Sequence, residues 1–274
     1  MDEVKPKSKE NLVIVLLIVL ILLLSAALVY LVFFSGKDKD STKKEETNTK
    51  QDIEEPRELN KSELSDLMNI IDKYYLRNLA DHYKNKKFTS TLDNGMLELM
   101  YYYMQEQDND SWSKYFENGK EWSFDISKAD NYFKTLYGFK ADEYKDLLCD
   151  LDKIPLLKYD KENNKYVFND EHPGHGGRTV GYTDYYVTSS SKTNNRYEIA
   201  VLFLYGNEMD GYYVNGEELN IDFDESYVEP EDFIKAYKDY FKENINEFKS
   251  FNKYVFTFEK VNNNYLLKEF NIEK

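Results

Sequence analysis

The segment His172-Pro173-Gly174-His175-Gly176-Gly177 holds the side chains best suited to metal chemistry. Its two histidines could share one ion, with Asp170 or Glu171 adding an oxygen ligand. Their spacing brings ligands together on a helix, but the proline and the glycines of this segment prevent a helix. We therefore interpret the segment as a turn that leads into a strand. His172 and His175 stay candidate binding residues, and no metal site is expected.

Trp112 and Trp122 are the second pair of candidate binding residues, with Tyr115 between them in the sequence. Exposed aromatic rings commonly stack on sugar rings, which would suit a polysaccharide ligand. The competing interpretation is that these rings pack between helices. The high aromatic content, with 25 tyrosines and 17 phenylalanines, favours a core of packed rings.

No catalytic residue can be named from the sequence. The chain has no glycine-rich phosphate loop, no nucleophile elbow, no His-Glu-x-x-His and no Ser-x-x-Lys. Paired carboxylates for glycoside hydrolysis stay open, because their separation appears only in three dimensions. No cofactor is expected.

A calcium loop is weighed and set aside. Asp160, Glu162, Asn164 and Glu171 match four positions of such a loop, but Lys165 stands where the loop needs glycine. The residues after it alternate as a strand does, so a hairpin turn is expected here.

Cys149 is the only cysteine, which excludes an intramolecular disulfide and a cysteine-based zinc site. It is expected to be a small, buried apolar residue. His82 is expected at the water-facing end of a helix, without an obvious partner.

Helices in the first half of the domain would position the tryptophans. The capping-box pair Asn60 and Glu63 opens a helix that is expected to end near Tyr83. A second helix is predicted over residues 93–107, and a loop with both tryptophans follows it. Ser127 is expected to cap a third helix, which Gly138 ends.

Antiparallel strands are predicted from residue 154 onward, where the apolar spacing changes. The clearest hairpin signal is Asn215-Gly216, and Pro230 opens one late helix. The fold class is therefore α+β. The predicted strands are residues 154–159, 166–168, 179–189, 196–205, 212–214, 217–221, 253–259 and 265–272.

The apolar run from Leu12 to Phe34 contains one polar side chain, Ser25, and no charge. As a helix it spans about 34 Å, which is enough for a bilayer core of about 30 Å. The alternative is a signal peptide cleaved after Ala27, but the apolar run continues beyond that point. The predicted organisation is a short tail (1–11), a transmembrane anchor (12–34), a charged disordered linker (35–60) and an α+β domain (61–274), with a helical part (61–150) and a strand-rich part (151–274).

The amino-terminal tail and the anchor sum to zero charge, so the whole formal charge of −15 lies on residues 35–274. Without a basic stripe, a nucleic-acid partner is not expected. Lysines flank the anchor on both sides in similar number, so the positive-inside rule does not decide the orientation. A short amino-terminal tail before a large domain favours a signal anchor with the domain outside. A cytoplasmic domain is the alternative.

Three segments carry a resemblance to other proteins: LLKYDKENNKYVF at 156–168, HPGHGG at 172–177 and YVFTFEKVNNNYLLKEF at 254–270. On the basis of these segments, residues 125–274 resemble membrane-anchored extracytoplasmic α+β proteins of low-GC Gram-positive bacteria, which have no assigned activity. The resemblance implies a location and a fold class, and it transfers no catalytic residue.

The expected function is that of a single-pass protein of the cell membrane whose outer domain acts by binding. The lipid bilayer is the first expected partner, through residues 12–34, and an envelope polymer or another surface protein is the second. The alternative is an envelope-directed hydrolase or metal-dependent enzyme that uses the His172 and His175 segment.

Overall fold

The computed structural model describes residues 55–118, 121–149, 153–169, 182–207, 211–219, 235 and 239–274. Within these ranges, no helix combines the length and apolarity needed to cross a membrane. The predicted anchor at residues 12–34, the segment at 172–177 and most of the helix predicted after Pro230 lie outside the described residues. The described elements include helices and antiparallel sheets, which confirms a mixed α+β fold.

The first helix, α2 (Lys61–Lys73), begins as predicted but ends about ten residues early. Asn60 accepts hydrogen bonds from the Ser62 and Glu63 amides, and the Glu63 carboxylate accepts from the Asn60 amide. Tyr75 then takes a left-handed conformation with φ of 56°, which an α-helix cannot contain. The short 3-10 helix η1 (Leu76–Asp81) follows, so the prediction of one helix up to Tyr83 was wrong.

The second helix, α3 (Asn94–Gln107), agrees with its prediction, and the Asp93 side chain caps it by accepting from the Met96 amide. The predicted loop that follows is in part a helix, α4 (Asn109–Asn118), which carries Trp112. This helix is short, and its Trp112 and Tyr115 pack against the core. Packing of these rings, more than the local apolar pattern, therefore stabilises it.

The third helix, α5 (Ile126–Leu136), starts one residue before the predicted cap at Ser127. Asp125 takes the N-cap position, without a side-chain hydrogen bond to the helix. Gly138, at φ of 84°, ends the helix as predicted.

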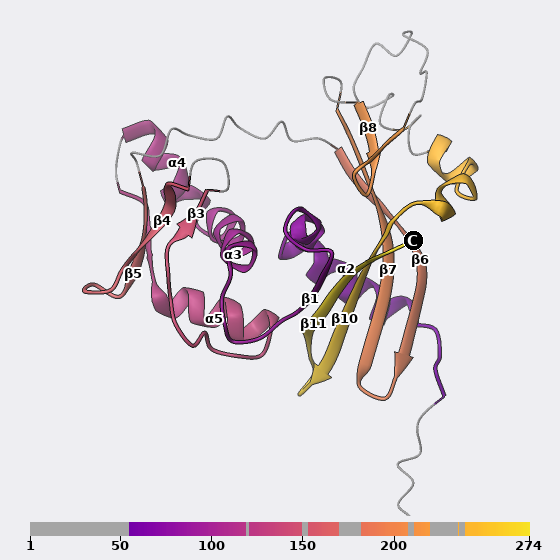
Figure 1. Ribbon diagram of the computed structural model, residues 1–274, viewed down its shortest axis with the longest axis horizontal. Helices are drawn as coiled ribbons and strands as arrows, with labels where there is room; N and C mark the ends of the chain where they lie inside the picture. Colours follow the sequence, from indigo (N-terminus) through magenta and orange to yellow (C-terminus); the bar gives the residue numbers. More distant parts are fainter. Residues whose placement is uncertain are drawn as a thin grey trace, which may run out of the picture. The chain divides into compact units, whose positions relative to one another are not determined.

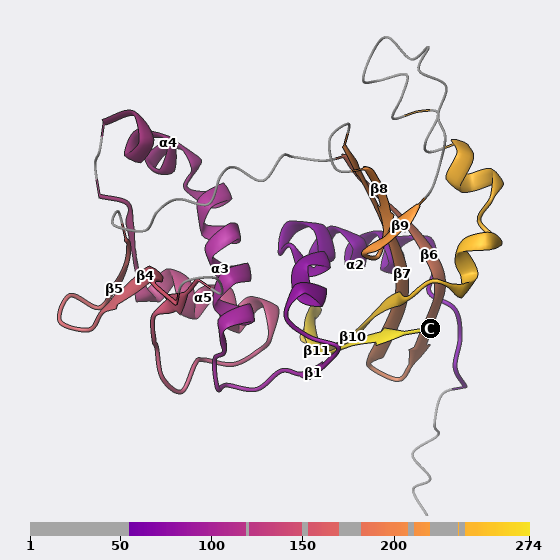
Figure 2. The same ribbon diagram turned by 45° about the horizontal axis from the view of Figure 1, so that its top comes forward.

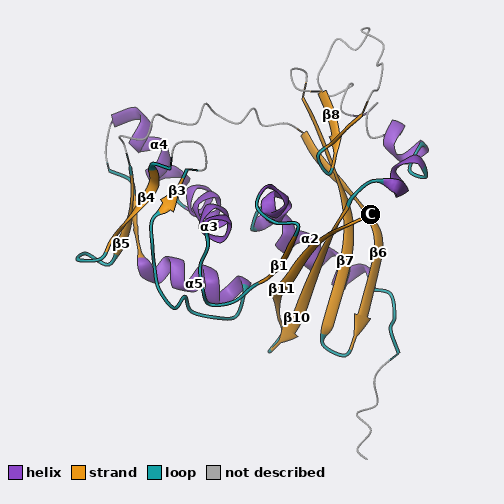
Figure 3. Ribbon diagram, viewed as in Figure 1, coloured by secondary structure: helices purple, strands orange, loops and turns teal. Residues whose placement is uncertain are grey.

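A small four-stranded sheet lies beside α3, α4 and α5 (Figures 1 and 3). Its order is β2-β5-β4-β3, and all its pairings are antiparallel. The β4/β5 hairpin confirms the turn predicted in place of a calcium loop, and the Asp160 carboxylate accepts from Asn163 inside it. The strands are β2 (Ser123–Asp125), β3 (Leu147–Leu148), β4 (Pro155–Asp160) and β5 (Lys165–Phe168).

The larger antiparallel sheet has seven strands among the described residues, and its long central strand is β7 (Arg196–Asn207). One edge of β7 pairs with β6 along its whole length. The other edge pairs first with β10 and then with β8 (Figure 2). Asn215 and Gly216 both have positive φ, which confirms the predicted hairpin turn. The remaining strands are β1 (Asn85–Lys87), β6 (Tyr182–Thr193), β8 (Gly211–Val214), β9 (Glu217–Leu219), β10 (Lys253–Val261) and β11 (Asn264–Glu273).

The expectation that strands begin only near residue 154 was wrong, because β1, β2 and β3 lie within the predicted helical part. β1 pairs with β11, which joins the first half of the domain to its carboxyl-terminal strand in one sheet. At only two or three residues each, these strands leave no readable alternation in the sequence.

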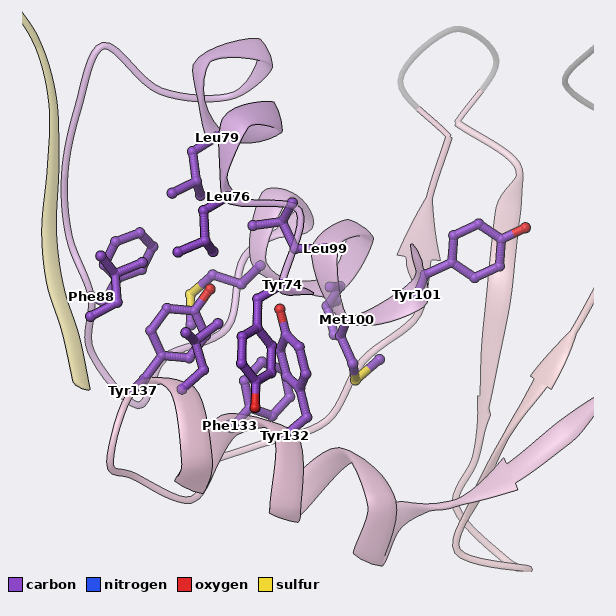
Figure 4. Packing of buried hydrophobic residues seen from close by; sticks show 14 of the residues in the cluster. Tyr74, Leu76, Leu79, Phe88, Leu99, Met100, Tyr101, Tyr132, Phe133 and Tyr137 are labelled. Atoms are coloured by element: carbon purple, nitrogen blue, oxygen red, sulfur yellow. The ribbon is translucent and has the colours of Figure 1, made fainter. Parts of the chain in front are cut away.

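The described core has one large cluster and one small one. In the large cluster, Figure 4 shows the rings of Tyr74, Tyr132 and Phe133 gathered together, while Tyr101 points away from them. The small cluster includes Leu202 and Leu204 of β7, together with Phe241 and Phe248. Because alternate residues of β7 enter different clusters, both faces of this strand are buried.

Candidate functional site

A cavity of about 330 Å³ lies where the end of α3, the strand β2 and the first turns of α5 meet. On α3, Tyr103, Met104 and Gln107 face it, since residues i, i+1 and i+4 share one side of a helix. A pocket of this size is at the lower end of the range for small-molecule sites, roughly 300–1,000 Å³.

The floor of the cavity is apolar and aromatic. Trp122, Phe124 and Met104 line it, with 1%, 4% and 4% of their surface exposed. Trp112 does not line the cavity but supports its floor, because its ring packs edge-on against Trp122 at 4.7 Å between centroids. The Trp122 indole N–H has no hydrogen-bond acceptor within the part of the chain that the structure describes.

The rim of the cavity is polar. Gln107, Ser127, Lys128 and Asn131 are exposed side chains that could donate or accept hydrogen bonds. The Lys128 ammonium lies 4.0 Å from Asp108 Oδ2. Because both groups reach solvent, this ion pair stabilises the fold by only about 0–1 kcal/mol.

The described lining of the cavity offers aromatic surface and hydrogen-bonding groups. Asp108 is the only acidic side chain in its lining, so the lining lacks the two carboxylates that glycoside hydrolysis usually needs. The lining also contains no histidine or cysteine. An aromatic floor below a rim of amides and hydroxyls suits a small polar ligand with an apolar face.

The four predicted binding residues separate into two groups. Trp112 of α4 and Trp122, which directly precedes β2, are brought into contact, and Trp122 is buried as the core-packing interpretation describes. His172 and His175 lie outside the described residues. Among the residues that the structure does describe, no three histidine, cysteine, aspartate or glutamate side chains gather as a metal site.

Two single-residue expectations have clear outcomes. Cys149 is buried, as predicted. His82 was expected to face water without a partner, and this was wrong. Its side chain is 10% exposed, and its Nε2 lies 3.2 Å from Glu98 Oε2 on α3.

A separate polar cluster joins β1 to the start of α3. The Tyr83 hydroxyl and the Lys86 ammonium both donate to the carboxylate of Asp93. Burial alone would raise the pKa of Asp93, but hydrogen bonds from Lys86, Tyr83 and the Met96 amide outweigh it and lower the pKa. Since Asp93 also caps α3, this cluster is explained as a structural one.

Sequence reasoning missed the rim residues of the cavity. Ser127 and Asn131 are one helical turn apart, and Gln107 and Asp108 end α3, but neither pattern signals a ligand in the sequence. They become a site only because β2 brings α3 and α5 together around Trp122.

No protein-family model matches this chain, and neither a curated protein nor a solved structure matches it.

Proposed function

We propose that this chain is a membrane-tethered, non-enzymatic binding module that holds a saccharide unit of the cell envelope in the Trp122 cavity. The observation that carries the proposal is the combination of a half-buried aromatic ring, Tyr103, above the buried Trp122 and Phe124 with a rim of amide and hydroxyl groups. Sugar rings have apolar faces and hydroxyl edges, so they need both kinds of surface.

The size of the cavity supports a single sugar ring and not an extended chain. About 330 Å³ is enough for one ring, and the exposed rim residues leave that ring continuous with solvent. A polymer could therefore place one residue in the cavity while its neighbours stay outside.

The tether is proposed from the apolar run at residues 12–34, and the binding role from the composition of the cavity. An anchored domain next to an insoluble polymer needs no high affinity for each sugar, because many sites act together.

Cosedimentation with purified, insoluble peptidoglycan tests the proposal. The full chain in detergent micelles is expected to pellet with the polymer, and Asn131→Ala on the rim should weaken pelleting about fivefold or more, the effect of losing one well-formed hydrogen bond. Asn69→Ala, at an exposed asparagine of α2 away from the cavity, is the matched control. Absence of pelleting, or equal pelleting of both variants, would contradict the proposal and favour a protein partner.

A further inference from the structure

We propose that the Trp122 cavity recognises the acetamido group of an N-acetylated amino sugar. This inference rests on the function proposed above and names its substrate class. Three features of the cavity carry it: a small apolar floor, a rim with carboxamides from two helices, and a lining without net charge.

The first feature is the small area of the apolar floor. Met104, Trp122 and Phe124 line the cavity with only 4%, 1% and 4% of their surface exposed. A methyl group can cover a patch of this size, whereas the face of a whole sugar ring extends beyond it. A hydroxyl group placed there would lose its hydration, while a methyl group gains an apolar contact. The half-buried Tyr103 then remains to contact the sugar ring itself.

The second feature is the pair of carboxamides on the rim. Gln107 is the last residue of α3, and Asn131 lies in the second turn of α5, so the two approach the cavity from different helices. Both side chains are exposed, and each offers a donor and an acceptor. An acetamido group carries one N–H and one C=O next to its methyl group. Its two polar atoms can therefore meet the rim while the methyl group meets the floor.

The third feature is the absence of net charge in the lining. Lys128 is its only basic side chain and Asp108 its only acidic one, and their charged atoms lie 4.0 Å apart. A free amino sugar brings an ammonium group and a sugar acid brings a carboxylate. Either ion would give up part of its hydration next to a lining that already pairs its own charges. A neutral acetamido group avoids this cost.

Calorimetric titration of the full chain in detergent micelles tests the inference with two trisaccharides. Triacetylchitotriose and cellotriose have the same linkage and differ at C2, where the first carries an acetamido group and the second a hydroxyl. We expect the acetylated trisaccharide to bind about tenfold tighter, the combined effect of burying one methyl group and forming one hydrogen bond. The fully deacetylated chitotriose should bind no tighter than cellotriose.

Gln107→Leu and Asn131→Leu test the rim. Each keeps the bulk of the side chain but removes its amide, and both positions are exposed, so the fold should be retained. Each should lower the affinity for triacetylchitotriose about fivefold, the effect of one lost hydrogen bond, and leave the affinity for cellotriose unchanged. Asn69→Leu, at an exposed position of α2 outside the lining, is the matched control and should change neither affinity.

The outcomes separate the two proposals. Equal affinity for the two trisaccharides, or equal losses for both in the rim variants, would overturn acetamido recognition and leave saccharide binding standing. Pelleting with peptidoglycan without binding of either trisaccharide would also overturn this inference alone. Failure to bind either trisaccharide, together with failure to pellet, would overturn both.

Discussion

Asn215 shows how one side chain can replace part of a strand. β7 pairs with β10 up to Val201 and with β8 from Leu204 onward, so its backbone at the junction lacks a strand partner on that edge. The Asn215 side chain accepts from the Phe203 amide at 2.7 Å and donates to the Val201 carbonyl at 2.9 Å. It is 8% exposed, and it also donates to the Asn252 carbonyl. Asn215 thus forms the turn and closes the gap between two strands.

The first prediction concerns this residue. Asn215→Gly keeps the left-handed turn but leaves the Phe203 amide without its acceptor, so the free energy of unfolding should fall by about 2–3 kcal/mol. The measurement is chemical denaturation of the full chain in detergent. Asn263→Gly is the matched control: Asn263 also has positive φ, 67°, but is exposed, and its loss should change stability by less than about 0.5 kcal/mol. Similar losses in both variants would show that Asn215 acts only through the turn.

At the scale of elements, the segment before α2 is part of the fold. Residues 55–60 belong to the predicted linker, yet the Arg57 amide donates to the Lys192 carbonyl at 3.1 Å, and the Lys192 amide donates back at 2.7 Å. The Arg57 guanidinium also forms two hydrogen bonds, of 2.9 and 2.7 Å, with the Glu63 carboxylate. The segment therefore links the edge strand β6 to the start of α2.

The second prediction is that this link weakens in acid. The hydrogen bond from Arg57 is the main cause that lowers the pKa of Glu63 from 4.5 to about 2, and the Asn60 amide adds to it. A lowered pKa means that the ionised form stabilises the folded state. This contribution, roughly 1 kcal/mol or less for a pair that reaches solvent, is present above pH 4.5 and is lost as the pH falls towards 2.

Glu63→Gln should therefore destabilise the chain at pH 7, and the difference from the unmodified chain should shrink between pH 4.5 and pH 2. Urea denaturation at several pH values measures it. Glu58→Gln removes an exposed carboxylate of the same segment and should have little effect. A constant difference across the pH range would show that the Glu63 charge does not stabilise the fold.

At the scale of the whole molecule, the carboxyl-terminal strand of the domain contacts residues of its first half. β1, from the first half, pairs with β11 at the carboxyl end, and the Lys268 ammonium donates to the Tyr137 carbonyl after α5. Glycine is favoured at position 138, because its φ of 84° lies in the left-handed region that other residues rarely adopt. The predicted helical part is therefore joined to the large sheet through backbone and side-chain contacts.

The third prediction concerns topology in the membrane. If residues 12–34 span the bilayer with the domain outside, protease added to intact protoplasts should remove the domain and leave a small membrane-bound fragment. The physical reason is that the apolar run is long enough to span the bilayer and holds no charge. Protection until the membrane is disrupted would place the domain inside. Release of the intact domain without protease would show that the run is a cleaved signal peptide.

Local rules made much of the fold readable from the sequence. The capping box at Asn60 and Glu63, the glycine after α5 and the turn at Asn215-Gly216 act within a few residues, and each was found where it was predicted. The paired strands of the large sheet follow from their alternation and from these turns. The sequence alone therefore determined the α+β class and most of the hairpins.

Only the tertiary structure decided the short elements and the candidate site. The left-handed Tyr75, the helix α4 and the strands β1 to β3 are stabilised by contacts with residues far away in the chain, which a local pattern does not contain. The cavity has the same cause, since Trp122, Gln107 and Asn131 share no sequence motif and meet only when α3, β2 and α5 pack together. A binding site of this kind is a property of packing, because its residues are selected by position in space and not by spacing along the chain.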